Sequence, residues 1–161
     1  YVFDPEFAFY GPMGYDVGNI IANMFFAWAN GDATIEDAAE KERFCGWVID
    51  CIEEIVDKFI DKFKAAFKEN VTDTMAKTEG LLEYYLGTVL SDTAGVAGLE
   101  SIRRIAGMAN NKDITTIADE AKRVRAERII VTLAKNYIMN RDRFTSGADY
   151  RRAIEEAIAK F

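Results

Sequence analysis

The chain has 161 residues, half of them hydrophobic, which is enough for one domain with a substantial core and too apolar for a disordered segment. Its formal net charge of −7 at pH 7 argues against nucleic acid or an anionic membrane as a partner. The sequence contains no histidine, which excludes histidine general bases, Ser-His-Asp triads and histidine metal ligands within this chain. No apolar run is long enough to predict a membrane span.

The first residues differ in character from the rest of the chain. Residues 1–3 are aromatic and β-branched, which predicts the end of a buried β-strand. Pro5 and Pro12 exclude a helix across this segment. Because a lone short strand is not stable by itself, we expect the natural protein to continue upstream of Tyr1.

Beyond this segment, hydrophobic side chains recur every three or four residues and predict a mainly α fold. Asp16 is a favourable N-cap for the first helix. Gly46 predicts a bend in the second helical stretch, and Gly80 and Gly87 allow one break in the third. The expected helices cover residues 17–30, 34–44, 47–67, a stretch from 72 or 73 to about 107, a short turn at 114–117, 119–143 and 150–159.

The two cysteines, Cys45 and Cys51, lie six residues apart in a predicted helix, so their side chains are about 9 Å apart along the axis. That separation exceeds the reach of a disulfide bond. Two unpaired thiols predict a reducing compartment, and therefore the cytoplasm.

Asp4 and Glu6 form a pair of carboxylates in the N-terminal segment. Residues i and i+2 of an extended backbone project from the same face, and Pro5 favours an extended backbone at Asp4. Mg²⁺ typically binds one or two protein carboxylates together with substrate phosphates. The pair therefore has two readings, a magnesium site or an acidic turn without a function.

Arg103 and Arg104 form a second charged pair, on the predicted third helix. Guanidinium groups bind phosphate or carboxylate in a bidentate manner and stay charged, which suits a phosphoryl-transfer site. In the alternative reading Arg104 pairs with Glu100 on the helix surface and Arg103 only extends its stem over the surface. The small residues at 94–98 would let a ligand or another backbone approach closely.

Two segments resemble the methylthioribose kinase family. Residues 3–18, FDPEFAFYGPMGYDVG, are similar to the metal-binding segment of that family, and residues 95–109, GVAGLESIRRIAGMA, are similar to its twin-arginine helix. These small-molecule kinases belong to the aminoglycoside-phosphotransferase and choline-kinase group, which is related in fold to the protein kinases. With the helical layout between the two segments, the resemblance covers nearly the whole chain, but only the C-terminal portion of the family.

The resemblance implies that residues 1–161 are a single helical domain, the C-terminal part of a kinase C-lobe, with a strand remnant at the start and without the N-lobe and the catalytic loop. It implies ATP-dependent phosphorylation of 5-methylthioribose in methionine salvage, with ATP as co-substrate and Mg²⁺ as cofactor. Asp4 would hold the metal at the nucleotide, and Glu6 would be a second metal ligand. Arg103 and Arg104 would bind the sugar and act in catalysis, and Asp16 would support the catalytic loop. The implied partners are the missing N-terminal part and a second copy in a homodimer, and the chain alone would be inactive.

Two alternatives stay open at this stage. The chain could be a non-catalytic helical interaction module whose small-residue patch binds a partner helix, or a kinase of the same superfamily that acts on another sugar or an amino alcohol. The kinase interpretation requires that the two acids and the two arginines converge on opposite walls of one cleft.

Overall fold

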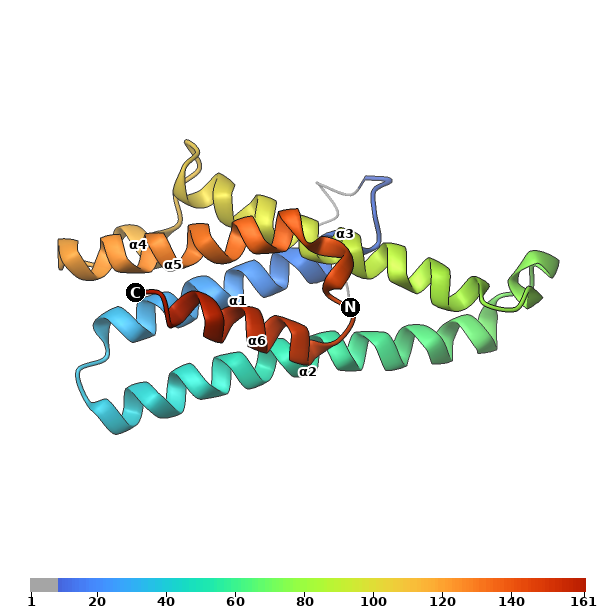
Figure 1. The fold of residues 1–161 in the computed structure, drawn as a ribbon, viewed down its shortest axis with the longest axis horizontal. Coiled ribbons are helices and arrows are strands. Elements are labelled where there is room, and N and C mark those ends of the chain that lie inside the picture. The colour runs from blue at the N-terminus through green and yellow to red at the C-terminus, as the bar shows by residue number, and fades with distance from the viewer. Residues whose placement is uncertain (1–8) are drawn as a thin grey trace.

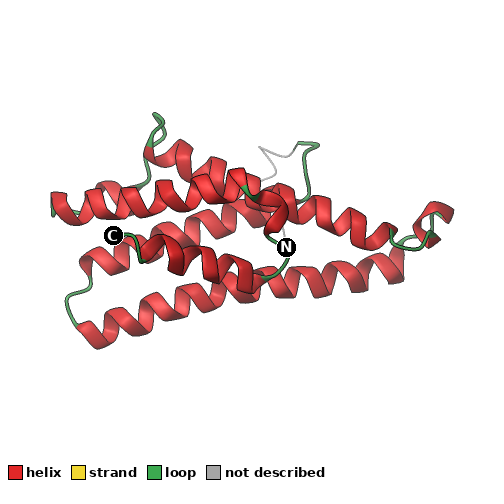
Figure 2. Cartoon of the chain, viewed as in Figure 1, coloured by secondary structure: helices red, strands yellow, loops and turns green. Residues whose placement is uncertain are grey.

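The computed structural model describes residues 9–161, and within this range every regular element is helical (Figure 2). The mainly α prediction is confirmed, whereas the strand expected at residues 1–3 lies outside the described residues. The elements are α1 (Gly14–Thr34), α2 (Ala38–Asn70), the 3-10 helix η2 (Thr74–Lys77), α3 (Leu81–Ile105), α4 (Lys112–Thr115), α5 (Glu120–Met139), the 3-10 helix η3 (Arg141–Arg143) and α6 (Gly147–Ile158).

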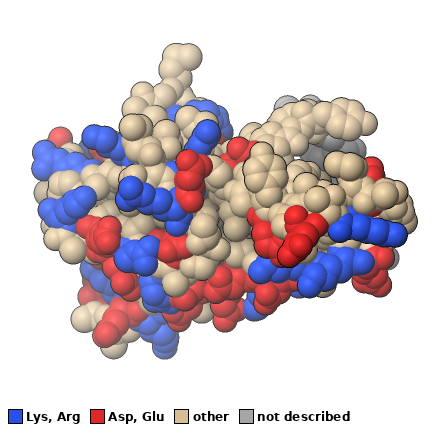
Figure 3. All heavy atoms as spheres, turned by 45° about the vertical axis from the view of Figure 1, so that its right-hand side comes forward, with Lys and Arg blue, Asp and Glu red and all other residues tan. Residues whose placement is uncertain are grey.

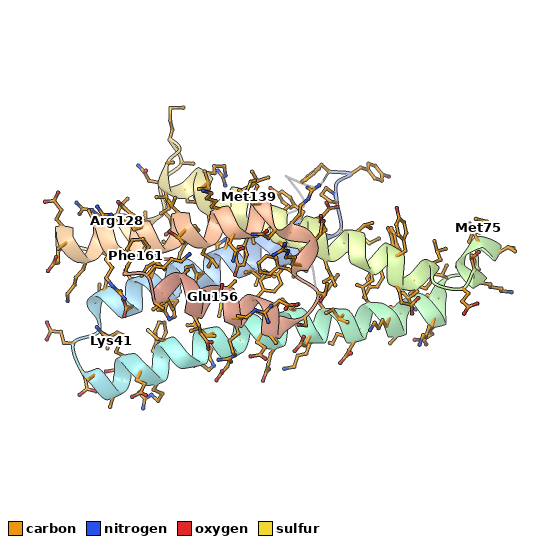
Figure 4. The ribbon with its side chains drawn as sticks, viewed as in Figure 1. Lys41, Met75, Arg128, Met139, Glu156 and Phe161 are labelled. Carbon is orange, nitrogen blue, oxygen red and sulfur yellow. The ribbon has the colours of Figure 1, made fainter. Side chains whose placement is uncertain are left out.

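Helix α1 lies at the centre of the molecule and packs against α2, α3, α4 and α5 (Figure 1). Its central position follows from its composition, because Ile21, Phe25, Phe26 and Trp28 are each at most 3% exposed. The long helices run along the long axis of the molecule, with α6 lying on α2. The N-terminal half of α3 and the C-terminal half of α2 extend beyond this body as a helical pair that ends at η2, where Met75 is exposed (Figure 4).

Two of the predicted helix details are wrong. Helix α1 begins at Gly14 with Met13 as the N-cap residue, so Asp16 lies in the first turn and is not the cap. A carboxylate in the first turn still interacts favourably with the helix dipole. Helix α2 continues through Gly46 without a break, so the helices expected at 34–44 and 47–67 are one, because Val48 and Ile52, both fully buried, hold the helix against the core and outweigh the low helix propensity of glycine.

The break expected in the third helix is present at Gly80, which has φ 79° and separates η2 from α3. Asp73, at which the third helix was expected to begin, accepts a hydrogen bond from the Met75 backbone N–H and caps η2 instead of the long helix. Helix α5 ends at Met139, and the remainder of the expected 119–143 helix is η3. Ser146 is the N-cap residue of α6, which starts at Gly147, three residues before the expected start at 150.

Glycine residues let α1 and α5 pack unusually close to α3. A Cβ at Gly18 would lie 2.6 Å from the Thr93 carbonyl oxygen, and a Cβ at Gly14 would lie 2.6 Å from the Val89 carbonyl oxygen. On the other side of α3, a Cβ at Gly98 would lie 2.7 Å from the Ala134 carbonyl oxygen of α5. The glycines therefore fix the position of α3, the helix that carries both arginines.

A hydrogen-bonded contact joins α6 to α2. The carboxylates of Asp50 and Glu53 pair with the Arg151 guanidinium, and the Gly147 backbone N–H donates to the Asp57 carboxylate at 2.7 Å. An acid at a helix N-terminus satisfies an unpaired N–H group and interacts favourably with the helix dipole. None of the helices in residues 9–161 combines the length and hydrophobicity needed to span a bilayer.

Candidate functional site

Arg103 and Arg104 lie in the last turn of α3 and bind the same carboxylate, that of Glu100. The Nε and Nη2 atoms of Arg103 donate to Oε2 of Glu100 at 2.9 and 2.6 Å, and Nε of Arg104 donates to Oε1 at 2.7 Å. The Glu100 side chain is only 7% exposed, whereas those of Arg103 and Arg104 are 53% and 31% exposed. A buried anion therefore holds two guanidinium groups at the protein surface.

The electrostatics of this cluster follow from its geometry. Burial raises the pKa of Glu100, but hydrogen bonds from Arg104 and Arg103 outweigh that effect and leave the pKa below its ordinary value. The carboxylate is therefore ionised at neutral pH. Two cations and one anion leave a net positive charge at the C-terminal end of α3, a favourable place for cations.

Of the two readings of the arginine pair, the structure tests only the one that pairs Arg104 with Glu100, and the phosphoryl-transfer site stays a prediction. The predicted Arg104–Glu100 ion pair is present. The expectation that Arg103 only extends over the surface is wrong, because Arg103 also binds Glu100. The sequence suggested Glu100 as a partner of Arg104 alone, although its spacing of three and four residues from the two arginines was a signal that it can reach both.

The small residues at 94–98 do not form an open patch. Ala94, Ala97 and Gly98 are buried, and Gly98 packs against α5. This correction removes the support that these residues gave to a bound ligand beside the arginines. It equally removes the support for a partner helix, because helices of the same chain already cover the patch.

Two segments of the chain project from the side of the molecule on which α3 lies (Figure 1). One is the N-terminal segment of residues 9–13, and the other is the loop after α3, residues 106–111. In the space-filling view a hollow separates them, with charged side chains of both signs below and between the projections (Figure 3). Thr93, which contacts Gly14, lies ten residues before Arg103, or about 15 Å along the helix axis.

Asp4 and Glu6 lie outside the described residues, so their convergence with the arginines stays a prediction. Asp16 is exposed in the first turn of α1, next to the N-terminal projection, and its role toward a catalytic loop also stays a prediction. Within residues 9–161 no three acidic or cysteine side chains cluster as metal ligands. A magnesium site of one or two carboxylates completed by phosphates does not need such a cluster.

A second hollow lies on another face, between α5 and α6, with a volume of about 570 Å³. Met139 of α5 and Glu156 of α6 contribute to its lining (Figure 4). Lys135 and Lys160 lie on the same groove, which therefore mixes apolar, basic and acidic side chains.

The fold and the site together define a mainly helical domain that holds two partly exposed guanidinium groups at the end of α3. No protein-family model matches the chain. Among curated proteins, it is 35% identical over 155 residues to methylthioribose kinase from Geobacillus kaustophilus, a match that covers 96% of this chain and 37% of that protein. It is 32% identical over 156 residues to methylthioribose kinase 2 from Oryza sativa subsp. japonica, covering 90% of this chain and 36% of that protein.

The match to methylthioribose kinase from Exiguobacterium sibiricum is 35% identity over 150 residues, which covers 93% of this chain and 36% of that protein. The chain therefore spans little more than a third of the length of the relatives that it matches. The resemblance inferred from the two motifs is confirmed, and the chain is homologous to a part of the methylthioribose kinases. With the helical architecture of residues 9–161, this homology supports the expected fold class, a mainly α lobe of a kinase.

Proposed function

We propose that this chain is the C-terminal part of an ATP- and Mg²⁺-dependent kinase that phosphorylates 5-methylthioribose in methionine salvage. The observation that carries the proposal is homology to methylthioribose kinases over 90–98% of the chain. The arginine pair at the end of α3 supports it, because phosphoryl transfer needs fixed positive charge beside the transferred group.

In this proposal, Arg103 and Arg104 bind the sugar and stabilise charge on the phosphoryl group as it moves. The reaction forms a bond between a sugar hydroxyl oxygen and the γ-phosphorus, breaks the bond from that phosphorus to ADP, and passes the hydroxyl proton to a base. That base belongs to the N-terminal part of the whole protein, which we expect to supply the catalytic loop. The two guanidinium groups stay protonated throughout, so they act by charge and position.

Asp4 and Glu6, outside the described residues, have the oxygen ligands that suit Mg²⁺. When bound, the metal neutralises charge on the phosphates of ATP. Asp16 is next to this segment in sequence and, in the proposal, supports the catalytic loop of the whole protein. The domain assignment, residues 1–161 as one helical unit completed by an N-terminal part, belongs to the same proposal, as does a homodimer.

A cytoplasmic location completes the proposal. Cys45 and Cys51 are both free thiols, as the sequence predicted. Free thiols suit a reducing compartment, in which a metabolic kinase would have its substrates.

The proposal is tested in the full-length protein by ADP release in the presence of ATP, Mg²⁺ and methylthioribose. The isolated chain should release no ADP, and steady turnover by it would show that the N-terminal part is dispensable. Arg104→Glu in the full-length protein should abolish methylthioribose binding, measured by calorimetry. The matched control is Arg43→Glu, which reverses an exposed charge on α2 and should leave binding unchanged. Wild-type affinity in Arg104→Glu would remove this arginine from the pocket.

The same assay separates methylthioribose from other acceptors. A panel of sugars and amino alcohols, offered to the full-length protein at equal concentration, should give the highest kcat/KM with methylthioribose. A higher value with another acceptor would keep the kinase class and replace the substrate.

A further inference from the structure

The Glu100 carboxylate is the least expected feature of α3. Burying a carboxylate is unfavourable unless it is paired, and a well-packed apolar side chain at such a position is often equally stable or more stable. Glu100 is 7% exposed and lies on the side of α3 that packs against α1, one turn beyond Val96. Stability alone therefore gives a weak reason for an acid at this position.

Helix geometry gives a better reason. Side chains of adjacent helical residues diverge by about 100°, so Arg103 and Arg104 do not face the same way by default. Glu100 lies three residues before one arginine and four before the other, and both spacings place side chains on neighbouring parts of the helix surface. Its two oxygens accept from different arginines, Oε2 from Arg103 and Oε1 from Arg104.

The pairing leaves donors for a ligand. Of the five N–H groups of a guanidinium, Arg103 uses two on Glu100 and Arg104 uses one, so most of the N–H groups of both have no acceptor within residues 9–161. Both guanidinium groups are also partly exposed. The buried carboxylate of Glu100 binds the inner N–H groups of both guanidinium groups, so their remaining N–H groups are directed toward a ligand at the surface.

We propose that Glu100 is a positioning residue, which holds Arg103 and Arg104 together so that their outward N–H groups bind one anionic or hydroxyl-rich ligand. The inference rests on the proposed function, since the ligand is taken to be methylthioribose and the phosphoryl group that it receives. Glu100 itself touches no substrate and acts only through the arginines. Its loss should therefore weaken the site without removing any substrate contact of its own.

The test is kinetic and uses the full-length protein. Glu100→Gln keeps the size of the side chain but replaces one acceptor oxygen with an N–H donor that faces an arginine. We expect kcat/KM for methylthioribose to fall roughly 10- to 100-fold, by analogy with the loss found when the hydrogen-bond partners of metal-binding side chains are removed. KM for ATP should change less than twofold. Glu100→Asp keeps the charge but has a shorter side chain, and its kcat/KM for methylthioribose should lie between the values for Glu100→Gln and the wild type.

A double-mutant cycle separates positioning from a general structural role. If Glu100 acts through the pair, Glu100→Gln should reduce kcat/KM little further in a protein that already carries Arg103→Ala and Arg104→Ala. A purely structural role would give the same loss in both backgrounds. The matched control is Glu53→Gln, which removes an acid from another arginine, Arg151, at the α2–α6 contact and should leave both KM values unchanged.

The outcomes distinguish the two proposals. Wild-type kinetics in Glu100→Gln together with a strong loss in the double arginine variant would overturn the positioning role and leave the proposed function intact. Wild-type kinetics in the double arginine variant would overturn the arginine role in the proposed function. If Glu100→Gln does not fold, as judged by its thermal unfolding, Glu100→Asp decides the question, and unaltered kinetics in that variant would overturn the positioning role.

Discussion

The contact between α1 and α3 depends on Gly18, and adding one methyl group there should disturb it. The Cβ of Gly18→Ala would lie 2.6 Å from the Thr93 carbonyl oxygen and 2.8 Å from Cβ of Val96. Ordinary van der Waals contact begins at 3.4 Å, so the two helices must separate by about 0.8 Å. Overpacking of this kind costs about 1–3 kcal/mol, and the better helix propensity of alanine returns about 1 kcal/mol.

Gly87→Ala is the matched control, because Gly87 is exposed on α3 and a Cβ there meets nothing within 4 Å. This variant should gain the propensity term alone and be about 0.5–1 kcal/mol more stable than the wild type. Urea unfolding followed by circular dichroism measures both variants, and their difference isolates the packing cost, about 1–3 kcal/mol. Equal stabilisation by Gly18→Ala and Gly87→Ala would refute the close contact between the helices.

Three further predictions concern titratable groups that are buried or partly buried. The hydroxyl groups of Tyr137 and Tyr150 are buried without a hydrogen-bond partner among residues 9–161, and burial raises the pKa of both above the ordinary value near 10. Tyr150→Phe should therefore unfold in urea at pH 7 with equal stability or up to about 2 kcal/mol more; a loss of more than 1 kcal/mol would contradict this expectation. Below pH 10 both hydroxyl groups are protonated in the folded and in the unfolded chain, and the free energy of unfolding does not depend on their ionisation. Above pH 10 they ionise readily only in the unfolded chain, so the free energy of unfolding falls as the pH rises. The double variant Tyr137→Phe/Tyr150→Phe should therefore lose less stability above pH 10 than the wild type. For Cys45, burial raises the pKa of the thiol to about 11, so iodoacetamide at pH 8 should alkylate it about 100-fold more slowly than an ordinary protein thiol when Cys51 is replaced by serine, and denaturation should abolish this protection; equally fast alkylation in the native protein would show that the thiol is not shielded.

Much of the helical architecture could be predicted from the sequence, because the signals for a helix are local. Among the periodic apolar residues of α2, Val48, Ile52, Val56 and Ile60 are buried in the structure. The break before α3 follows from the conformational freedom of Gly80, which adopts φ 79°. The failure at Gly46 has the opposite origin, since burial of the neighbouring residues outweighs a local propensity of about 1 kcal/mol.

The candidate site could be predicted only in part. The sequence singled out Arg103 and Arg104 from their chemistry and from the motif that contains them, and it paired Arg104 with Glu100. It did not show that Glu100 is buried or that Arg103 binds the same carboxylate, because burial depends on which helix covers that side of α3. The roles of Asp4, Glu6 and Asp16 stay predictions that rest on the motif.

The sequence by itself determined where the helices form, which of their faces are apolar, and which two segments resemble the methylthioribose kinases. These properties depend on residues within a few positions of each other. The tertiary structure decided what the glycines do and how the arginines are held. Gly18 and Thr93 are far apart in the chain, and no local pattern states that their backbones touch. The small residues near the arginines look like an open patch in the sequence and are a helix contact in the structure, because the free energy of burial is gained between helices and not along them.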